Sequence, residues 1–292
     1  MHKAGFVNII GNPNVGKSTL MNAFIGEKLS IITSKAQTTR HRILGIVNGE
    51  DFQVILSDTP GIIKPAYELQ ASMMDFVKSA FEDADVLLYM VEIGEKALKD
   101  ERFFDKIKNS KIPVLLLLNK VDTATQELSE EQVQYWQEEL PTVEIHPISA
   151  LQNFNIKGVF ERILELLPKS PAYYPKDQLT DKPERFFVNE TIREKILMFY
   201  KKEIPYAVEV ETEEFFEDEE IIRIRSVIMV ERDSQKGIII GHKGSALKKV
   251  GVESRKDLEK FFDKQVHIEL YVKVNKNWRN DSRQLRRFGY NK

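Results

Sequence analysis

A glycine-bounded loop near the start of the chain constrains the fold more than any other feature. Residues 11–18 read GNPNVGKS, which fits the spacing G-x-x-x-x-G-K-[ST]. An apolar run at 5–11, GFVNIIG, precedes the loop, and a helix-forming stretch that ends at Gly26 follows it. A strand that leads through such a loop into a helix predicts an α/β fold in which backbone N–H groups surround a phosphate.

The rest of the first half alternates apolar runs with amphipathic stretches. The segment 42–58, RILGIVNGEDFQVILSD, predicts a hairpin, because Asn48-Gly49 suits a tight primed turn. Further apolar runs lie at 85–92, 112–120 and 143–149, with helical segments between them. Runs rich in Val, Ile and Leu predict a mostly parallel, doubly wound sheet covered on both faces. The hairpin places one antiparallel strand at the edge.

The pattern changes near Pro168. The segment 168–186 contains four prolines and little apolar periodicity, which indicates a spacer. We therefore expect a first domain at 1–167, a linker at 168–185 and a smaller α+β domain at 186–292.

The second half has its own order of elements. We expect a helix, two strands, a glycine loop, a helix and a final strand. The expected ranges are 189–203 with Asn189 or Thr191 as the cap, 206–215, 220–232, 245–262 with an interruption around Gly251, and 266–274. In the last strand Val266, Ile268, Leu270, Val272 and Val274 point to one side.

Composition excludes several classes of protein. The chain has 292 residues, a net charge of −2 and no cysteine, so disulfides and thiolate metal sites are excluded. No apolar run approaches the ~18 residues of a membrane span, and the first residues lack the pattern of a signal peptide. We expect a cytoplasmic protein.

The first glycine loop and the residues after it carry the chemistry of phosphate binding. Gly11 and Gly16 permit the turns that bring backbone N–H groups to a β-phosphate. Lys17 reaches the β- and γ-phosphates, and the Ser18 hydroxyl is a ligand for Mg²⁺.

Three further motifs follow apolar strands in the order that a guanine nucleotide site requires. Asp58 in DTPG is placed to hold Mg²⁺ through water, and the Gly61 N–H can meet the γ-phosphate. The Asp122 carboxylate in NKVD can accept two hydrogen bonds from guanine, whereas adenine presents an acceptor that opposes it. The Ala150 N–H in ISAL can meet the guanine O6. These residues therefore argue against an ATP-using enzyme.

A threonine-bearing segment, KAQTTRHR at 35–42, lies between the first helix and the hairpin. Its position suits a mobile loop that covers Mg²⁺ and the γ-phosphate. Either Thr38 or Thr39 can supply a hydroxyl to the metal, and we favour Thr39.

Taken together, PNVGKSTL, QTTRHR and DTPGI resemble the Era family of translation-factor-related GTPases. The resemblance implies a switch that binds GTP or GDP with Mg²⁺ and hydrolyses GTP slowly. Ile62 stands where Ras-like proteins have a water-positioning glutamine, so the water-orienting group is unidentified. We expect Lys17, Thr39 and Gly61 to carry catalysis with backbone donors.

Residues from all these motifs make up the expected nucleotide site. The metal ligands are Ser18, Thr39 and Asp58. The nucleotide-binding residues are Gly11, Asn12, Pro13, Asn14, Val15, Gly16, Lys17, Ser18, Thr19, Asp58, Thr59, Pro60, Gly61, Ile62, Asn119, Lys120, Val121, Asp122, Ser149, Ala150 and Leu151.

A second glycine loop, GHKG at 241–244, is too short to wrap a β-phosphate. A tight turn between two helices is the default explanation of these four residues alone, but their surroundings resemble a KH domain of the bacterial type II order. There the GxxG loop clamps the backbone of about four nucleotides of single-stranded nucleic acid. We expect RNA contacts from Ile240, Gly241, His242, Lys243, Gly244 and Lys248.

Charge is unevenly distributed in the second half. The segment 209–220 is strongly acidic, whereas the tail 276–292 is basic and carries Trp278 and Tyr290 for stacking or packing. A basic tail can follow a phosphate backbone, or it can be a solvated helix that caps the domain.

An N-terminal GTPase followed by a type II KH domain has the order of the Era family along nearly the whole chain. The resemblance implies binding near the 3′ end of the small-subunit (16S) rRNA, a role in maturation of the 30S subunit, a monomer, and peripheral association with the inner face of the cell membrane. The alternative is a regulatory GTPase that acts on a protein or membrane partner through its C-terminal domain.

Overall fold

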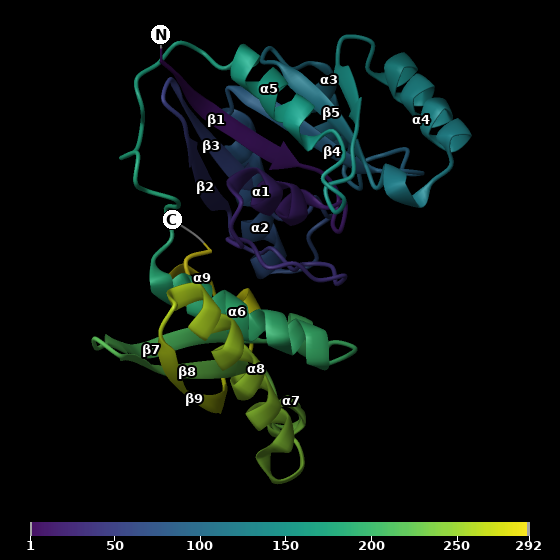
Figure 1. Ribbon diagram of the computed structural model, residues 1–292. Helices are drawn as coiled ribbons and strands as arrows, with labels where there is room; N and C mark the ends of the chain where they lie inside the picture. Colours follow the sequence, from purple (N-terminus) through teal and green to yellow (C-terminus); the bar gives the residue numbers. More distant parts are fainter. Residues whose placement is uncertain (1, 291–292) are drawn as a thin grey trace. The chain divides into compact units, whose positions relative to one another are not determined.

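The computed structural model describes residues 2–290. The chain divides into two compact units: the first extends to Asp181, apart from Tyr67–Leu69, which are grouped with the second unit that continues from Lys182. Each unit has its own sheet and its own layer of helices (Figure 1).

The first unit is built on a six-stranded sheet with the order β2-β3-β1-β4-β5-β6. Its strands are β1 (Lys3–Ile10), β2 (Ile43–Asn48), β3 (Phe52–Asp58), β4 (Val86–Glu92), β5 (Val114–Asn119) and β6 (Glu144–Pro147). All neighbours pair in parallel except β2 and β3. The predicted fold class, with one antiparallel strand at the edge, is confirmed.

Helices flank both faces of this sheet (Figure 1). They are α1 (Lys17–Ile25), α2 (Glu68–Glu82), α3 (Glu101–Lys108), α4 (Gln126–Glu139) and α5 (Ile156–Leu166). The Asp100 side chain caps α3 and the Thr125 side chain caps α4. By contrast the N-cap residue of α1 is Gly16, so no side chain caps its first turn. Its first N–H groups and the positive end of its dipole therefore point toward whatever lies in the preceding loop.

The hairpin was predicted correctly, but its turn was not. Residues 49–51 connect β2 to β3, and the Gly49 N–H bonds the Phe52 carbonyl at 3.0 Å. Neither Asn48 nor Gly49 has a positive φ, which a type I′ turn requires. The connection has three residues instead of the two of a type I′ turn, so the backbone can reverse direction without a residue at positive φ.

Most of the segment predicted as a linker lies along the first unit. The buried Gln53 side chain accepts the N–H groups of Tyr173 and Tyr174 at 2.7 and 3.0 Å, and it donates to the Tyr174 carbonyl at 2.8 Å. Farther on, the Ile46 N–H donates to the Leu179 carbonyl at 2.8 Å. These bonds explain why a proline-rich segment is ordered.

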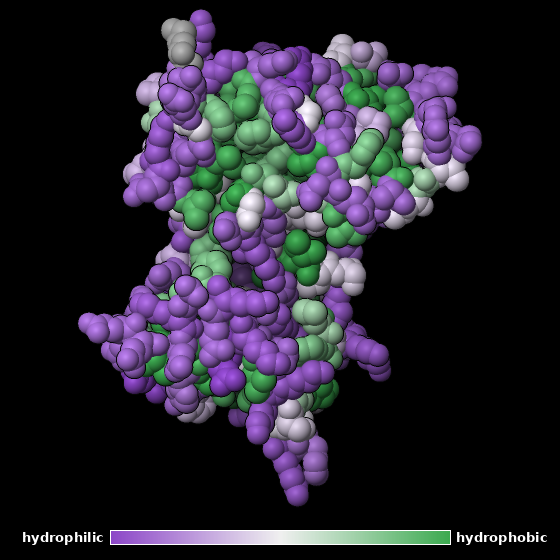
Figure 2. Space-filling view, in the orientation of Figure 1, coloured by the Kyte–Doolittle hydropathy of each residue, from purple (hydrophilic) through white to green (hydrophobic). Residues whose placement is uncertain are grey.

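The second unit is a three-stranded sheet with the order β7-β8-β9, in which β8 pairs antiparallel with β7 and parallel with β9. Its strands are β7 (Glu209–Glu217), β8 (Ile221–Val230) and β9 (Gln265–Val274), and its helices are α6 (Glu184–Phe199), α7 (Asp233–Ile240), α8 (Ser245–Phe262) and α9 (Ser282–Arg287). Hydrophilic residues cover most of its visible face (Figure 2). The predicted inward face of β9 packs on the core.

Helix α7, just before the second glycine loop, was not in the expected order of elements. Two further details of this unit differ from expectation. Helix α6 starts at Glu184 after Pro183, so neither Asn189 nor Thr191 caps it; Asn189 instead accepts the Thr212 hydroxyl at 2.7 Å. Helix α8 is continuous through Gly251, which was predicted to interrupt it. Glycine inside a helix costs about 1 kcal/mol relative to alanine, but it does not by itself end the helix.

The aromatic residues of the tail are used for packing. Trp278 is fully buried and its indole N–H donates to the Ala207 carbonyl at 3.1 Å. Tyr290 is buried and its hydroxyl bonds Glu209 at 2.7 Å. The last two residues of the tail lie outside the described residues. Between residues 2 and 290, none of the helices has both the length and the apolar character to cross a membrane.

Replacing Gln53 by Leu should release residues 173–174 from the first unit. A leucine side chain cannot form hydrogen bonds, so the backbone groups of Tyr173 and Tyr174 lose their buried partner. The free energy of unfolding should therefore fall by about 1–3 kcal/mol. Hydrogen–deuterium exchange of the full chain should show faster exchange of the Tyr173 and Tyr174 amides. Lys176→Ala, which removes exposed bonds to the Gly49 and Glu50 carbonyls, is the matched control. Unchanged exchange at residues 173–174 in the Leu variant would contradict this account.

Candidate functional site

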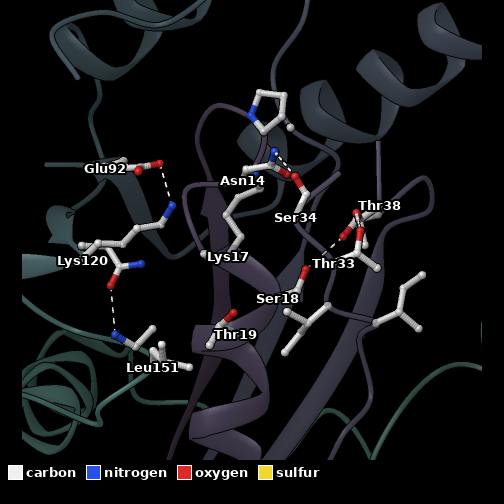
Figure 3. Close-up of a pocket in the computed structure, with 18 of the residues that line it drawn as sticks. Asn14, Lys17, Ser18, Thr19, Thr33, Ser34, Thr38, Glu92, Lys120 and Leu151 are labelled. Carbon is white, nitrogen blue, oxygen red and sulfur yellow. Dashed lines mark hydrogen bonds and ion pairs between the residues drawn. The ribbon is translucent and has the colours of Figure 1, made fainter. Parts of the chain in front are cut away.

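A cavity of about 620 Å³ lies where the loops after β1, β3, β5 and β6 converge. Figure 3 shows side chains from these loops around it. Predicted residues that line it are Pro13, Asn14, Gly16, Lys17, Ser18, Thr19, Thr39, Gly61, Asn119, Lys120, Asp122, Ala150 and Leu151. Residues from four separate motifs thus meet at one edge of the sheet, as parallel pairing requires.

The loop at 11–18 uses glycine where a side chain would not fit. Gly11 has φ +152° and Gly16 has φ +103°. A Cβ on Gly11 would lie 2.2 Å from the Met90 carbonyl oxygen, and one on Gly16 would lie 2.3 Å from the Asn119 amide nitrogen. Both positions therefore need glycine for backbone conformation and for space.

Gly61 brings the DTPG motif against the same loop. A Cβ on Gly61 would lie 2.6 Å from the Pro13 Cα. The next amide, that of Ile62, donates to the Gly11 carbonyl at 3.0 Å, and the Ile62 side chain is fully buried. The two loops therefore hold each other in register.

Lys17 is a buried cation at the start of α1. Its Nζ donates to the carbonyls of Asn12 at 2.8 Å and Gly11 at 3.2 Å. Burial lowers the pKa of Lys17 to about 8, while the charges of Asp58 and Glu95 oppose the shift. An anion in the cavity would favour the charged ammonium.

Ser18, Thr39 and Asp58 form a compact cluster of oxygens next to Lys17. The Ser18 hydroxyl donates to Asp58 Oδ2 at 2.6 Å, and the Thr39 hydroxyl lies 3.0 Å from Ser18 Oγ and 3.3 Å from Asp58 Oδ2. Burial raises the pKa of Asp58, and hydrogen bonds, first that from Ser18, oppose the rise. Its buried Oδ1 has no hydrogen-bond partner within the described part of the chain.

This cluster has the donors that Mg²⁺ prefers, namely hydroxyl and carboxylate oxygens. An unpartnered buried carboxylate oxygen also fits a cation, because a cation would offset the cost of burying the charge. Thr38 lies differently: its hydroxyl donates to the Lys35 carbonyl at 2.6 Å and lies 2.6 Å from the Thr33 hydroxyl (Figure 3). Of the two threonines, only Thr39 joins Ser18 and Asp58 in this cluster.

Asn119 ties the loops after β5, β1 and β6 together. Its amide nitrogen donates to the Val15 carbonyl at 2.7 Å, and its oxygen accepts the Ala150 N–H at 2.9 Å. The Ala150 amide, expected to meet the guanine O6, is thus bonded to Asn119 here. Beside it Lys120 has φ +66° and pairs with Glu92 at 2.7 Å (Figure 3). Asp122 is exposed to the cavity.

Several predicted residues lie behind the cavity wall. They are Gly11, Asn12, Val15, Asp58, Thr59, Pro60, Ile62, Val121 and Ser149. The Asn12 side chain donates to the Ala97 carbonyl at 2.9 Å and accepts the Lys99 N–H at 3.0 Å. The Thr59 hydroxyl donates to the Ile9 carbonyl at 2.7 Å. These two side chains brace the loops that face the cavity.

Other lining residues were missed by the sequence analysis. They are Ile31, Ile32, Thr33, Ser34, Gln37, Glu92 and Thr123. Most belong to the segment before Thr39, where no spacing rule marks individual positions. Glu92 could have been considered, since it ends a predicted strand next to the one that ends at Asn119.

The second glycine loop connects α7 to α8 as a single helical turn, His242–Gly244. Gly241, Lys243 and Gly244 have φ values of +70°, +48° and +77°. His242 and Lys243 are exposed at the tip, Lys248 is exposed one turn into α8, and Ile240 is half-buried. The loop therefore presents its backbone and two basic-type side chains to solvent.

Thr39→Val should weaken the metal dependence of catalysis, because it keeps the shape of the side chain and removes the hydroxyl beside Ser18. We expect GTP hydrolysis to slow by about tenfold or more, with half-saturation at a higher Mg²⁺ concentration. Hydrolysis assayed across a Mg²⁺ titration measures both. Thr39→Ser should behave as the wild type, and Thr38→Val should keep the wild-type Mg²⁺ dependence. A wild-type Mg²⁺ titration for Thr39→Val would overturn this assignment.

Comparison with known proteins agrees with the geometry. The family model described as "50S ribosome-binding GTPase" matches residues 6–120, and the one described as "KH domain" matches residues 203–279. GTPase Era of Staphylococcus haemolyticus is 44% identical over 99% of this chain and 97% of its own length. GTPase Era of Alkaliphilus metalliredigens is 44% identical, with 99% of each chain covered.

Two solved structures have the same architecture. One is Era in complex with MgGDPNP and nucleotides 1506–1542 of 16S ribosomal RNA, with a TM-score of 0.95 and 37% identity over all of both chains. The other is a single-residue variant of Aquifex aeolicus Era bound to GDP and AlF₄⁻, with a TM-score of 0.95 and 38% identity over 99% of this chain and 100% of that one. The predicted family and fold are confirmed: this chain belongs to the Era family of GTPases.

Proposed function

We propose that this protein is a GTP-driven switch that binds small-subunit rRNA near its 3′ end and assists maturation of the 30S subunit. The GTP-driven switch is supported above all by the cluster of Ser18, Thr39 and Asp58 beside the buried Lys17. This cluster lies at the start of α1, where no side chain caps the helix. The binding of small-subunit rRNA is supported by the relative that was solved with MgGDPNP and a 16S rRNA segment.

In the first unit, backbone N–H groups and the Lys17 ammonium together bind the triphosphate. The loop 11–18 and the start of α1 supply N–H groups, and Lys17 is held by the Gly11 and Asn12 carbonyls so that it faces the phosphates. Ser18 and Thr39 would hold Mg²⁺ directly and Asp58 through water, and the metal would neutralise phosphate charge. Thr39 and the Gly61 N–H then report whether a γ-phosphate is present.

Guanine selectivity comes from the opposite end of the cavity. Asp122 supplies the carboxylate for two guanine donors, while Lys120 and the backbone at 149–151 enclose the base. Asn119 keeps these parts at a fixed distance from the phosphate loop through its bond to Val15. A base that left these polar groups unpaired would bind poorly.

Asp122→Asn should change the preferred base. The amide would offer a donor where guanine also donates, so GTP affinity should fall by about 100-fold or more, close to 2.7 kcal/mol. Xanthosine triphosphate presents an acceptor there and should bind better than GTP. Competition of both nucleotides against a fluorescent GDP analogue measures the change. Retained preference for GTP would contradict the base-recognition role of Asp122.

The second unit is the cargo-binding part, and its GHKG loop is the proposed contact with the RNA backbone. The glycines let phosphates approach the loop closely, and Lys243 and Lys248 supply positive charge. We extend the proposal to a monomer that associates peripherally with the inner face of the membrane, which rests on the family resemblance alone. The proposed cytoplasmic location rests on the composition of the sequence.

His242→Asp combined with Lys243→Asp should abolish RNA binding and leave GTP hydrolysis unchanged. Both side chains are exposed, and Asp tolerates the left-handed backbone at Lys243 better than most residues do. Filter binding of an RNA with the sequence of 16S nucleotides 1506–1542 measures the effect. The pair Lys256→Asp and Lys260→Asp, on exposed positions near the end of α8, is the control. Undiminished RNA binding by the loop variant would contradict the GHKG loop as the RNA contact, and failure of the wild type to bind this RNA would favour a protein or membrane partner instead.

A further inference from the structure

A buried serine lies beside the oxygen cluster, in a segment where no motif marks it. Ser30 is 1% exposed and stands between α1 and the threonine-bearing segment. Between residues 2 and 290 its hydroxyl finds no hydrogen-bond partner, and the same holds for Oδ1 of the fully buried Asp58. Buried side-chain oxygens are nearly always bonded in folded proteins, so two unbonded ones need a physical explanation.

Both oxygens belong to the same site. Burial raises the pKa of the Asp58 carboxyl, and the groups that oppose the rise are, in order, Ser18, Lys17, Ser30 and Thr39. The hydroxyls of Ser18 and Thr39 lie 2.6 and 3.3 Å from Oδ2. Among the residues that the structure describes, Oδ1 is bonded by no hydroxyl. The Ser30 hydroxyl therefore lies near the carboxylate but outside direct hydrogen-bond geometry.

The position of Ser30 is set by α1 through Asn22. Asn22 Oδ1 accepts the N–H groups of Leu29 and Ser30, each at 3.0 Å, and Asn22 Nδ2 donates to the Ser30 carbonyl at 2.8 Å. These bonds tie the backbone at 29–30 to a helix that begins at the phosphate loop. The segment that carries Thr39 follows this anchor. Ser30 therefore keeps its place beside Asp58 even where that segment moves.

A water of the Mg²⁺ shell suits the space between the two oxygens. A carboxylate only accepts hydrogen bonds, whereas a water donates two, so one water can bond Asp58 Oδ1 and the Ser30 hydroxyl together. Mg²⁺ in proteins keeps several of its waters, and the groups around the metal hold its ligands in place. Asp58 is already assigned to Mg²⁺ through water. Ile31, the residue after Ser30, lines the nucleotide cavity, so the two oxygens lie at its edge.

We propose that Ser30 holds a water of the Mg²⁺ shell together with Asp58 and is a further positioning residue for the metal. Its contribution is the same with GDP and with GTP, because Asn22 fixes it from α1. Thr39 differs: it lies in the segment expected to cover the γ-phosphate, so its contribution requires GTP. This division of roles rests on the nucleotide and Mg²⁺ site of the proposed function and adds a residue to it.

Ser30→Ala tests the proposal, because it removes the hydroxyl and leaves the backbone bonds to Asn22. Release of a fluorescent GDP analogue from the full-length protein is measured across a Mg²⁺ titration, and then release of a non-hydrolysable GTP analogue. Loss of a group that holds a metal ligand weakens metal affinity by about 10–100-fold, so Ser30→Ala should need about tenfold more Mg²⁺ or above to slow release of either nucleotide. Thr39→Val should shift the titration with the GTP analogue only.

The stability of the variant separates a metal role from a packing role. With GDP bound and Mg²⁺ removed by EDTA, Ser30→Ala should have a Tm equal to or above that of the wild type, since the lost hydroxyl has no partner in the described part of the protein. The matched control is Ser129→Ala on α4, whose hydroxyl donates to the Thr125 carbonyl at 3.0 Å away from the cavity. It should leave both titrations unchanged.

Several results would overturn the proposal. A wild-type GDP titration for Ser30→Ala would remove Ser30 from the metal site, and a shift with the GTP analogue alone would make it part of the threonine-bearing segment. A Tm well below that of the wild type in EDTA would assign it a packing role. If release from the wild type does not respond to Mg²⁺ at all, the Mg²⁺ site of the proposed function fails, and the role of Ser30 with it.

Discussion

The position of β1 between β3 and β4 is the constraint on which the nucleotide site depends. Both pairings are parallel, so the loops after β1 and β3 emerge side by side at one edge of the sheet. The same edge receives the loops after β5 and β6 because those strands run in the same direction. Gly61 can then touch Pro13, and Asn119 can reach Val15. The pairing of the strands therefore brings four motifs that are far apart in the sequence to one side of the nucleotide cavity.

The site that results is polar before any ligand enters it. Lys17 and Asp58 are both buried, and burial shifts the pKa of each toward the neutral form. The surrounding carbonyls and hydroxyls hold them in place, so little rearrangement is needed when opposite charge arrives. The second glycine loop follows another principle: its left-handed residues lie at the surface, where the backbone itself is offered to a ligand. In the first unit, glycine lets a loop enclose the cavity closely, and in the second unit it lets the backbone of a loop face the solvent.

Much of this could be predicted from the sequence, because short motifs and apolar runs report local requirements. The phosphate loop, the hairpin of β2 and β3 and the inward face of β9 all depend on neighbours in sequence. The errors arose where distant residues decide. Asn189, expected as a helix cap, instead accepts the Thr212 hydroxyl. For Trp278 and Tyr290 the sequence left stacking and packing open, and their bonds to Ala207 and Glu209 decide for packing. By contrast, the sequence already favours Thr39 over Thr38, and the Thr39 hydroxyl does lie beside Ser18 and Asp58.

The last residues of the first unit also cover one edge of its sheet. Strand β2 is at the edge, so its outer N–H and C=O groups would be a template for another chain. Residues 179–181 occupy that edge: Leu179 accepts the Ile46 N–H, the Thr180 hydroxyl bonds the Leu44 carbonyl, and Asp181 accepts the Leu44 N–H. The strand thus gains a partner too irregular to be extended by a further strand. The end of the first unit, just before the chain enters the second, thus occupies backbone positions of β2 that would otherwise be open to pairing with another strand.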